Sequence, residues 1–271
     1  MKHSCSAIVA IALVCSSWAS VPAQAQTEIT LLAVGPMRAP TQKIVADFEA
    51  KTGTKVKITY GNGVETRRMV AKGQPLDVSI IIAPFPGALT SGAILLNSAT
   101  PITSILTAIG VPKGRPKPDI STADAVRKAL LAAKRIGYED PDFTVAGQGP
   151  LEALTKLGIA EQVAGKSEVE LGPGAQGISP EATRNTVKTA TRLANGDIDI
   201  GMLMLSDMIP DKEKYDIVGV LPRSITAPVP VVGFIATRTT NATAAKALLD
   251  YLSSSPAQTI WKEAGYGPPE R

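Results

Sequence analysis

The residues best suited to chemistry lie where an apolar strand pattern gives way to a helix pattern. Residues 31–34 are apolar, and the turn that follows contains Gly35, Pro36, Met37 and Arg38. A helix that begins after a buried parallel strand presents N–H groups without intrahelical partners and the positive end of its dipole. The planar guanidinium of Arg38 would add donors matched to a carboxylate. We therefore predict that this turn binds an anion, with an arginine exposed to solvent as the alternative.

Other turns repeat this pattern of a strand followed by small residues. Residues 61–68 read GNGVETRR, and residues 144–154 read TVAGQGPLEAL. Glycine lets a backbone approach a ligand closely, although it serves an ordinary turn equally well. Residues 83–87, APFPG, follow the apolar run DVSIII and should reach the same edge of a sheet. From these turns we predict ligand contacts at Asn62, Gly63, Val64, Ala83, Pro84, Gly147 and Gln148.

The first 25 residues restrict the chemistry of the rest. A basic start, an apolar run and a small-x-small end predict a cleaved secretory signal peptide over residues 1–25. This segment holds both cysteines and the single histidine, so the mature chain would contain neither residue type. Disulfides, thiol nucleophiles, Ser-His-Asp triads and zinc sites built from His or Cys are then excluded.

The charged residues indicate neither a nucleic-acid site nor a metal site. The 28 basic and 24 acidic residues are scattered, without a basic stripe studded with aromatic side chains. Glu139, Asp140 and Asp142 lie close together, but the proline between them is typical of a turn, and we predict no metal. Residues 172–177, GPGAQG, match a dinucleotide fingerprint by letter only, because the expected helix starts later, and we predict no cofactor.

Strand and helix patterns alternate along the chain. Apolar alternation or short apolar runs predict strands, and 3.6-residue periodicity with capping residues predicts helices. This alternation is typical of an α/β protein with mostly parallel sheets flanked by helices. The expected strands cover 56–60, 77–82, 103–111, 135–140, 198–203 and 215–221, and the expected helices include 41–51, 121–135 and 179–196.

Two proline-rich segments suggest crossings between two lobes. They are residues 110–121 and 221–234, and extended proline-containing chain suits a hinge that bends as a unit. We therefore expect a first lobe from residues 26–110 and 228–271, and a second lobe from residues 111–227.

Several segments together resemble a known family. ITLLAVGPMRAPTQKIVADFEAKTG, VAKGQPLDVSII, ANGDIDIGML and KALLDYLSSSPAQTIWKEAGY follow one another in this order. On these segments the chain resembles bacterial periplasmic solute-binding proteins of the molybdate-binding type. The resemblance implies a two-lobed (type II) binding protein fold with a small anionic ligand in the cleft. It also implies a periplasmic location, delivery to the membrane permease of an ABC transporter, and a monomer.

The residues at the expected ligand turns differ from those of molybdate binders. Pro36 and Gly63 stand where the resemblance implies serines, and Met204 stands where it implies a tyrosine. We keep Met204 as a predicted ligand contact. The Met37–Arg38 pair is instead similar to a subgroup that includes periplasmic aconitate isomerase, which points to organic acids.

Two functional hypotheses follow from this resemblance. We expect a solute-binding protein that captures an organic carboxylate for ABC-type uptake, and not an enzyme. The alternative is an isomerase that interconverts cis- and trans-aconitate on the same scaffold. Without histidine, its acid and base would come from other side chains, and Glu65 is the carboxylate that sequence position places near the cleft, unless it is an ordinary surface residue.

Overall fold

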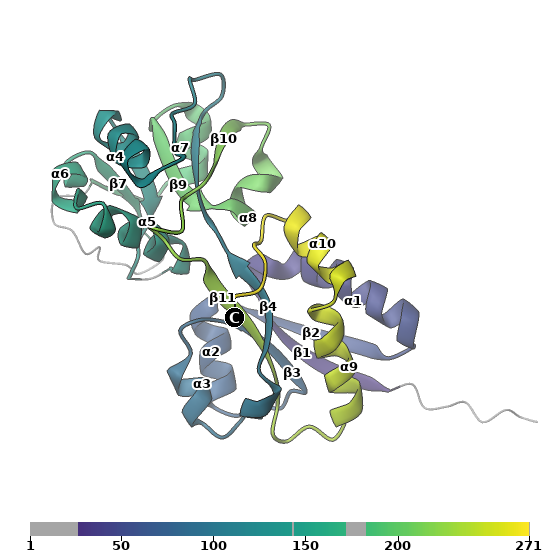
Figure 1. Ribbon diagram of the computed structural model, residues 1–271. Helices are drawn as coiled ribbons and strands as arrows, with labels where there is room; N and C mark the ends of the chain where they lie inside the picture. The colour runs from purple at the N-terminus through teal and green to yellow at the C-terminus, as the bar shows by residue number, and fades with distance from the viewer. Residues whose placement is uncertain (1–26, 143, 172–182, 271) are drawn as a thin grey trace, which may run out of the picture.

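The chain folds into two lobes, each built around one β-sheet with helices on its faces (Figure 1). The computed structural model describes residues 27–142, 144–171 and 183–270. The predicted signal peptide, Ser179, Pro180 and the GPGAQG segment lie outside these described residues. Within them, no helix is both long enough and apolar enough to cross a membrane.

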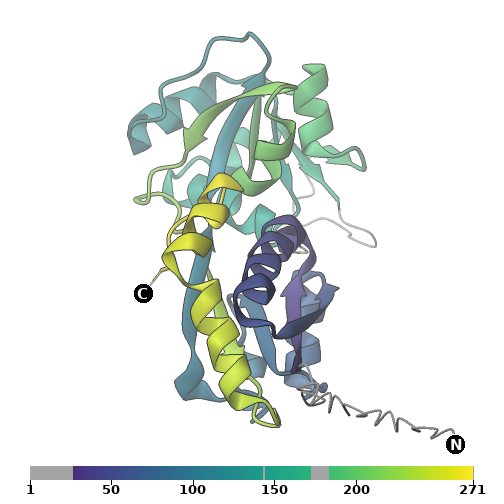
Figure 2. The same cartoon turned by 90° about the vertical axis from the view of Figure 1, so that its right-hand side faces the viewer.

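The first lobe contains the beginning and the end of the described chain. Its five described strands have the order β2-β1-β3-β11-β4, with β1 (Glu28–Val34), β2 (Lys55–Gly61), β3 (Val78–Ile82), β4 (Thr100–Ile105) and β11 (Val229–Ile235). The helical elements are η1 (Gly35–Met37), α1 (Arg38–Thr52), α2 (Gly63–Ala71), α3 (Pro86–Thr90), η2 (Leu96–Ser98), α9 (Ala242–Leu252) and α10 (Ser255–Glu263). Figure 2 shows α9 and α10 running along the lobe beside α1.

The second lobe is formed by the middle of the chain. Its six described strands have the order β10-β5-β9-β6-β7-β8, with β5 (Thr107–Pro112), β6 (Ile136–Glu139), β7 (Ser167–Glu170), β8 (Thr183–Asn185), β9 (Ile200–Met204) and β10 (Tyr215–Val220). The helical elements are α4 (Ala123–Ala132), α5 (Val145–Lys156), α6 (Ala160–Ala164), α7 (Thr189–Asn195), α8 (Leu205–Met208) and η3 (Ile209–Asp211).

The predicted α/β class is confirmed, and both sheets are mixed. Strand β1 is parallel to β2 and β3, and β6 is parallel to β7 and β9. The antiparallel pairs involve the strands on either side of the crossings, because the chain enters and leaves each lobe there: β11 pairs with β3 and β4, and β5 pairs with β9 and β10.

Each lobe has its own apolar core. All five residues of β3 are buried, as the continuous apolar run predicts for a strand covered on both faces. Phe48 of α1 and Trp261 of α10 pack into the same core of the first lobe. Leu130 of α4 and Ile136 of β6 belong to the core of the second lobe. Burial of this kind, at about 25 cal/mol per Å² of apolar surface, holds the helices onto their sheets.

The first crossing lies earlier than the sequence pattern predicts. The expected strand 103–111 is two strands, β4 in the first sheet and β5 in the second, with Leu106 between them. The lobe boundary therefore falls at Leu106 and not at residue 110, and residues 110–121 lie within the second lobe. The apolar run 102–111 suits a buried strand in either sheet, so hydrophobicity does not mark the place where the sheets change.

The returning crossing, residues 221–228, is held from two sides. Glu152 of α5 accepts hydrogen bonds from the Thr226 hydroxyl at 3.3 Å and the Ala227 N–H at 3.2 Å. Arg223 forms a two-bond ion pair with Glu270 in the C-terminal tail, at 2.5 and 3.1 Å. The crossing is thus tied to a helix of the second lobe and to the tail.

The helix expected over 179–196 is wrong for residues 183–188 and correct for residues 189–195. Thr183–Asn185 forms β8, which pairs in parallel with the outer edge of β7, and the helix α7 covers only Thr189–Asn195. The predicted end is correct, because Gly196 adopts φ 78°, the left-handed conformation that glycine favours after a helix. The N–H of Thr189 donates to Glu170 at 2.6 Å, so a carboxylate from β7 satisfies the start of α7.

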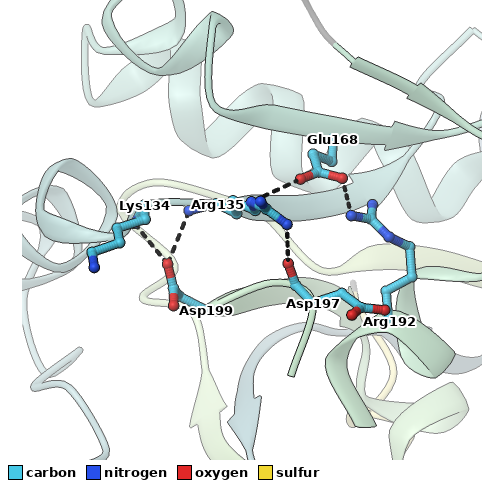
Figure 3. Close-up of polar contacts among 6 residues, drawn as sticks. All are labelled: Lys134, Arg135, Glu168, Arg192, Asp197 and Asp199. Atoms are coloured by element: carbon cyan, nitrogen blue, oxygen red, sulfur yellow. Dashed lines mark hydrogen bonds and ion pairs between the residues drawn. The ribbon is translucent and has the colours of Figure 1, made fainter. Parts of the chain in front are cut away.

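A buried ion-pair network fastens α7 to the second sheet (Figure 3). Glu168 of β7 accepts a hydrogen bond from Arg192 of α7, and its carboxylate lies 3.7 Å from Nε of Arg135. Glu168 and Arg192 are both buried, so neither charge is well solvated. The adjoining backbone contacts of the network involve Lys134, Arg135, Asp197 and Asp199.

We predict that Arg192→Met destabilises the protein by about 3 kcal/mol, because it leaves the buried Glu168 carboxylate without its closest partner. Urea unfolding monitored by circular dichroism would measure the loss. The matched control is Lys246→Met, which removes an exposed i,i+4 pair with Asp250 and should cost less than about 0.5 kcal/mol. Equal losses in the two variants would contradict the assignment of Arg192 as a buried partner.

Candidate functional site

A cavity of about 470 Å³ lies between the two lobes. Its wall is formed where strands end, at the carboxyl ends of β1, β2, β3, β4, β6 and β9, which is the usual ligand position in open α/β sheets. The residues that line it are Val34, Pro36, Met37, Asn62, Gly63, Val64, Arg67, Ile82, Ile105, Glu139, Asp142, Thr144, Val145, Ala146, Gln148, Met204, Ser206 and Tyr266.

Seven of the predicted ligand contacts are brought together in this wall. They come from three turns and one strand end that are far apart in the sequence: Pro36, Met37, Asn62, Gly63, Val64, Gln148 and Met204. The convergence follows from the topology, because the turns after β1, β2 and β6 all face the space between the sheets.

The other five predicted contacts do not line the cavity: Gly35, Arg38, Ala83, Pro84 and Gly147. Arg38 is exposed, and its guanidinium stacks over the ring of Tyr60, 3.8 Å from the centroid. Arg38 therefore lies outside the cavity lining, and the alternative of an arginine exposed to solvent applies.

Among the described residues, Arg67 is the cation that lines the cavity, in place of Arg38. It lies one turn into α2, and its Nη1 donates to the carbonyl oxygen of Pro84 at 2.9 Å. Pro84 thus contributes to the site indirectly, because its carbonyl positions the guanidinium. Sequence position alone gives no signal that separates Arg67 from its neighbour Arg68, since the rotation of the helix decides which side chain faces the cavity.

The turn into α2 forms a capping box between Asn62 and Glu65. Asn62 accepts a hydrogen bond from the N–H of Glu65 at 2.8 Å, and the Glu65 carboxylate accepts from the N–H of Asn62 at 3.3 Å. Glu65 is therefore a capping residue that does not line the cavity, which agrees with the alternative of an ordinary surface residue. The box leaves the first N–H groups of α2, at Gly63 and Val64, at the cavity wall.

The start of α5 forms part of the wall in the second lobe. Thr144 caps the helix by accepting from the N–H of Gly147 at 3.1 Å. Gly147 itself is buried against the end of β6, where a side chain would overlap the carbonyl oxygen of Glu139 and the backbone of Asp140 and Pro141. Its role is close packing of α5 onto β6, and this packing sets Gln148 at the cavity.

A tyrosine does line the cavity, but it comes from the C-terminal tail and not from the position that the resemblance implies. The resemblance implies a tyrosine at position 204, where Met204 lines the wall. Tyr266 lies in the C-terminal tail of the first lobe, and its hydroxyl donates to the carbonyl oxygen of Pro36 at 3.3 Å. Burial raises the pKa of Tyr266, so its hydroxyl stays protonated.

Two carboxylates, Glu139 and Asp142, line the wall contributed by the second lobe. Burial, and to a smaller extent the neighbouring carboxylates of Glu170 and Asp207, raise the pKa of Glu139 to about 7. Burial also raises the pKa of Asp207, to about 6. The proline within residues 139–142 predicts a turn and no ligand contact. The signal that could have found Glu139 is its position at the end of a strand, next to a predicted ligand turn.

The described part of the chain contains no group of three His, Cys, Asp or Glu residues arranged to hold a metal ion. The cavity wall instead combines apolar side chains with one guanidinium, two carboxyl groups, the hydroxyls of Ser206 and Tyr266, and helix starts from both lobes. Such a wall can orient a polar solute that also carries a carbon skeleton.

The chain is similar to known proteins over most of its length. A family model described as bacterial extracellular solute-binding protein matches residues 29–267. A protein from a Pseudomonas species named aconitate isomerase is 26% identical over 265 residues, which cover 95% of this chain and 94% of that protein.

Two solved structures share the fold at low sequence identity. The periplasmic molybdate-binding protein of Azotobacter vinelandii superposes with a TM-score of 0.63 and 17% identity, covering 89% of this chain and 100% of that one. A substrate-binding domain from Clostridium difficile, described as part of a molybdenum ABC transporter, gives a TM-score of 0.73 and 18% identity, covering 90% of this chain and 100% of that one. At these identities the likeness shows the fold.

We predict that Gly147→Ala destabilises the protein by about 2 kcal/mol, because the new methyl group would push α5 away from β6. Chemical unfolding would measure the change. Gly165→Ala is the matched control: Gly165 has an ordinary helical conformation and open space around it, so its change should stay within about 0.5 kcal/mol. A Gly147→Ala variant as stable as the control would show that α5 tolerates the displacement.

Proposed function

The chain belongs to the family of bacterial extracellular solute-binding proteins, and from this premise we propose that its lobes close on a small anionic solute in the cavity. The family places the protein outside the cytoplasmic membrane. We further propose that the solute is an organic carboxylate and that residues 1–25 are a cleaved signal peptide. The protein, a monomer, then delivers the bound solute to the permease of an ABC transporter.

The observation that carries the proposal of an anion is the shared position of Arg67 and the helix starts. Arg67 lines the cavity together with the first residues of α2 and α5. Helix N-termini favour negative charge, and a guanidinium offers paired donors to a carboxylate. Since α2 belongs to the first lobe and α5 to the second, one solute can contact donors on both lobes, which favours the closed form.

The apolar part of the wall supports an organic acid over molybdate. Met37, Ile82, Ile105 and Met204 line the cavity beside the polar groups. A tetrahedral oxyanion presents oxygen in every direction and would leave these side chains against polar atoms, whereas a carboxylic acid has carbon atoms to place there. The absence of hydroxyls at Pro36 and Gly63 acts in the same direction.

A second candidate function is isomerisation of aconitate. Two observations support it: the similarity over nearly the whole chain to a protein named aconitate isomerase, and the carboxyl group of Glu139 at the cavity wall. Moving the double bond of a tricarboxylate requires removal of one proton and return of another. A carboxyl group whose pKa is near 7 can accept and release a proton at neutral pH.

Incubation of the mature protein with cis-aconitate, followed by chromatography for trans-aconitate, separates the two functions. We expect binding without turnover if the protein delivers solute to a permease. Steady conversion that disappears in Glu139→Gln would establish the isomerase instead. Heat-denatured protein provides the background rate.

We predict that Arg67→Ala weakens binding of trans-aconitate by about 10- to 100-fold, because a hydrogen bond to a charged group contributes about 1.5–3 kcal/mol. Isothermal titration calorimetry would measure the affinity. Arg38→Ala is the matched control, since it removes an arginine of the same lobe that lies outside the cavity, and its affinity should remain within about twofold. A large loss in Arg38→Ala with none in Arg67→Ala would reverse the assignment of the cation.

A further inference from the structure

The two walls of the cavity carry opposite charge. Arg67 and the start of α2 form the wall of the first lobe, whereas Glu139 and Asp142 line the wall of the second lobe. An anionic solute that fills the space meets the guanidinium on one side and carboxyl groups on the other. Like charges in a partly buried site repel one another, so a bound anion favours the neutral form of a carboxyl group beside it.

Glu139 is the carboxyl group whose surroundings favour the neutral form. It is half-buried at the end of β6, and among the described residues the charged groups that face it are the carboxylates of Glu170 from β7 and Asp207 from α8, and the ammonium of Lys188 before α7. Two acidic groups and one basic group leave an excess of negative charge around it. The side chains of Thr144 and Lys188 act the other way and lower the pKa of Glu139, but burial and the two carboxylates outweigh them.

Its neighbours in this cluster have other roles. Glu170 accepts the N–H of Thr189 at 2.6 Å and so serves the start of α7 as a carboxylate. Asp142 is exposed at the cavity rim, where water can solvate its charge. Asp207 does not line the cavity, although the adjacent Ser206 does. Glu139 is the member that is half-buried and also lines the cavity.

We propose that Glu139 binds the solute in its carboxylic acid form and donates a hydrogen bond to an oxygen of the anion, so that binding takes up one proton from solution. The inference rests on the proposed function in requiring an anionic solute, and it assigns a specific donor on the second lobe. The proton resides on the Glu139 carboxyl group, no bond of the solute changes, and the bound pair carries one negative charge less.

This assignment determines how affinity depends on pH. Without solute the pKa of Glu139 is about 7, and a negative charge placed beside it raises that pKa further. Below about pH 7 the residue is already protonated, so affinity is highest and no proton is taken up. Above about pH 7 each binding event must protonate Glu139, and affinity falls by up to tenfold per pH unit until the pKa of the bound state is reached.

The test is calorimetric titration with trans-aconitate, tricarballylate and succinate at about pH 8, where these acids are ionised. Each titration is run in two buffers, Tris and Hepes, which differ in ionisation enthalpy, so that the slope of the observed enthalpy gives the number of protons taken up. We expect at least about half a proton per solute for the native protein at this pH, and close to none at about pH 5.5.

Glu139→Gln keeps the shape of the side chain and removes its titration, so uptake should fall close to zero and the pH dependence should flatten. Glu161→Gln, an exposed residue of α6 away from the cavity, is the matched control and should keep the native uptake. Thermal unfolding checks that both variants fold. A second measurement needs no variant: the carboxyl carbon resonance of Glu139 should titrate near pH 7 and shift to higher pH with saturating solute.

The outcomes distinguish this inference from the function on which it rests. Binding without proton uptake, or uptake that persists in Glu139→Gln, overturns the role of Glu139 and leaves the proposed anion binding intact. If none of the three acids binds at either pH, the proposed capture of an organic carboxylate fails, and the inference fails with it.

Discussion

The structure depends on one constraint: a single extended run of chain belongs to two sheets. Residues 100–112 enter the first sheet as β4, leave it at Leu106 and join the second sheet as β5, and residues 221–228 lead back to β11. Because the sheets are joined at these crossings, the carboxyl ends of β1, β2 and β3 face those of β6 and β9 across a shared space. The cavity is the consequence of this connection, and small movements at the crossings would change its width.

The same geometry gives the cavity its chemical character. Strand-to-helix turns bring helix starts to both walls, so positive potential is distributed on the two lobes, while one guanidinium, Arg67, adds a formal charge on the first lobe. Glu139 and Asp142 place acidic groups opposite. A cavity with a cation on one wall, acidic groups on the other and apolar side chains between them suits a solute that has both polar groups and a carbon skeleton better than a symmetric oxyanion. This is why the fold shared with molybdate-binding proteins does not by itself indicate their ligand.

Hydrogen bonds to nearby backbone atoms hold the residues of the site in position. Pro84 accepts a hydrogen bond from Arg67, Pro36 accepts one from Tyr266, and Thr144 caps the helix that presents Gln148. Positions that the sequence pattern marks as ligand contacts therefore act in two ways. Some line the cavity, and others, such as Pro84 and Gly147, position the residues that do.

The sequence by itself determined many of the local elements, among them buried β3, the turns at Pro36, Asn62 and Gln148, and the α/β alternation. These follow from periodicity and capping, which act over a few residues. Tertiary structure decided which side chains line the cavity, because that depends on contacts between residues far apart in the sequence. Rotation of α2 turned Arg67 rather than Arg68 toward the cavity, the path of the C-terminal tail brought in Tyr266, and the neighbours of β6 made Glu139 a half-buried acid with a raised pKa. The sequence also could not show that the chain passes from the first sheet to the second at Leu106, because apolar residues are equally suited to a buried strand in either lobe.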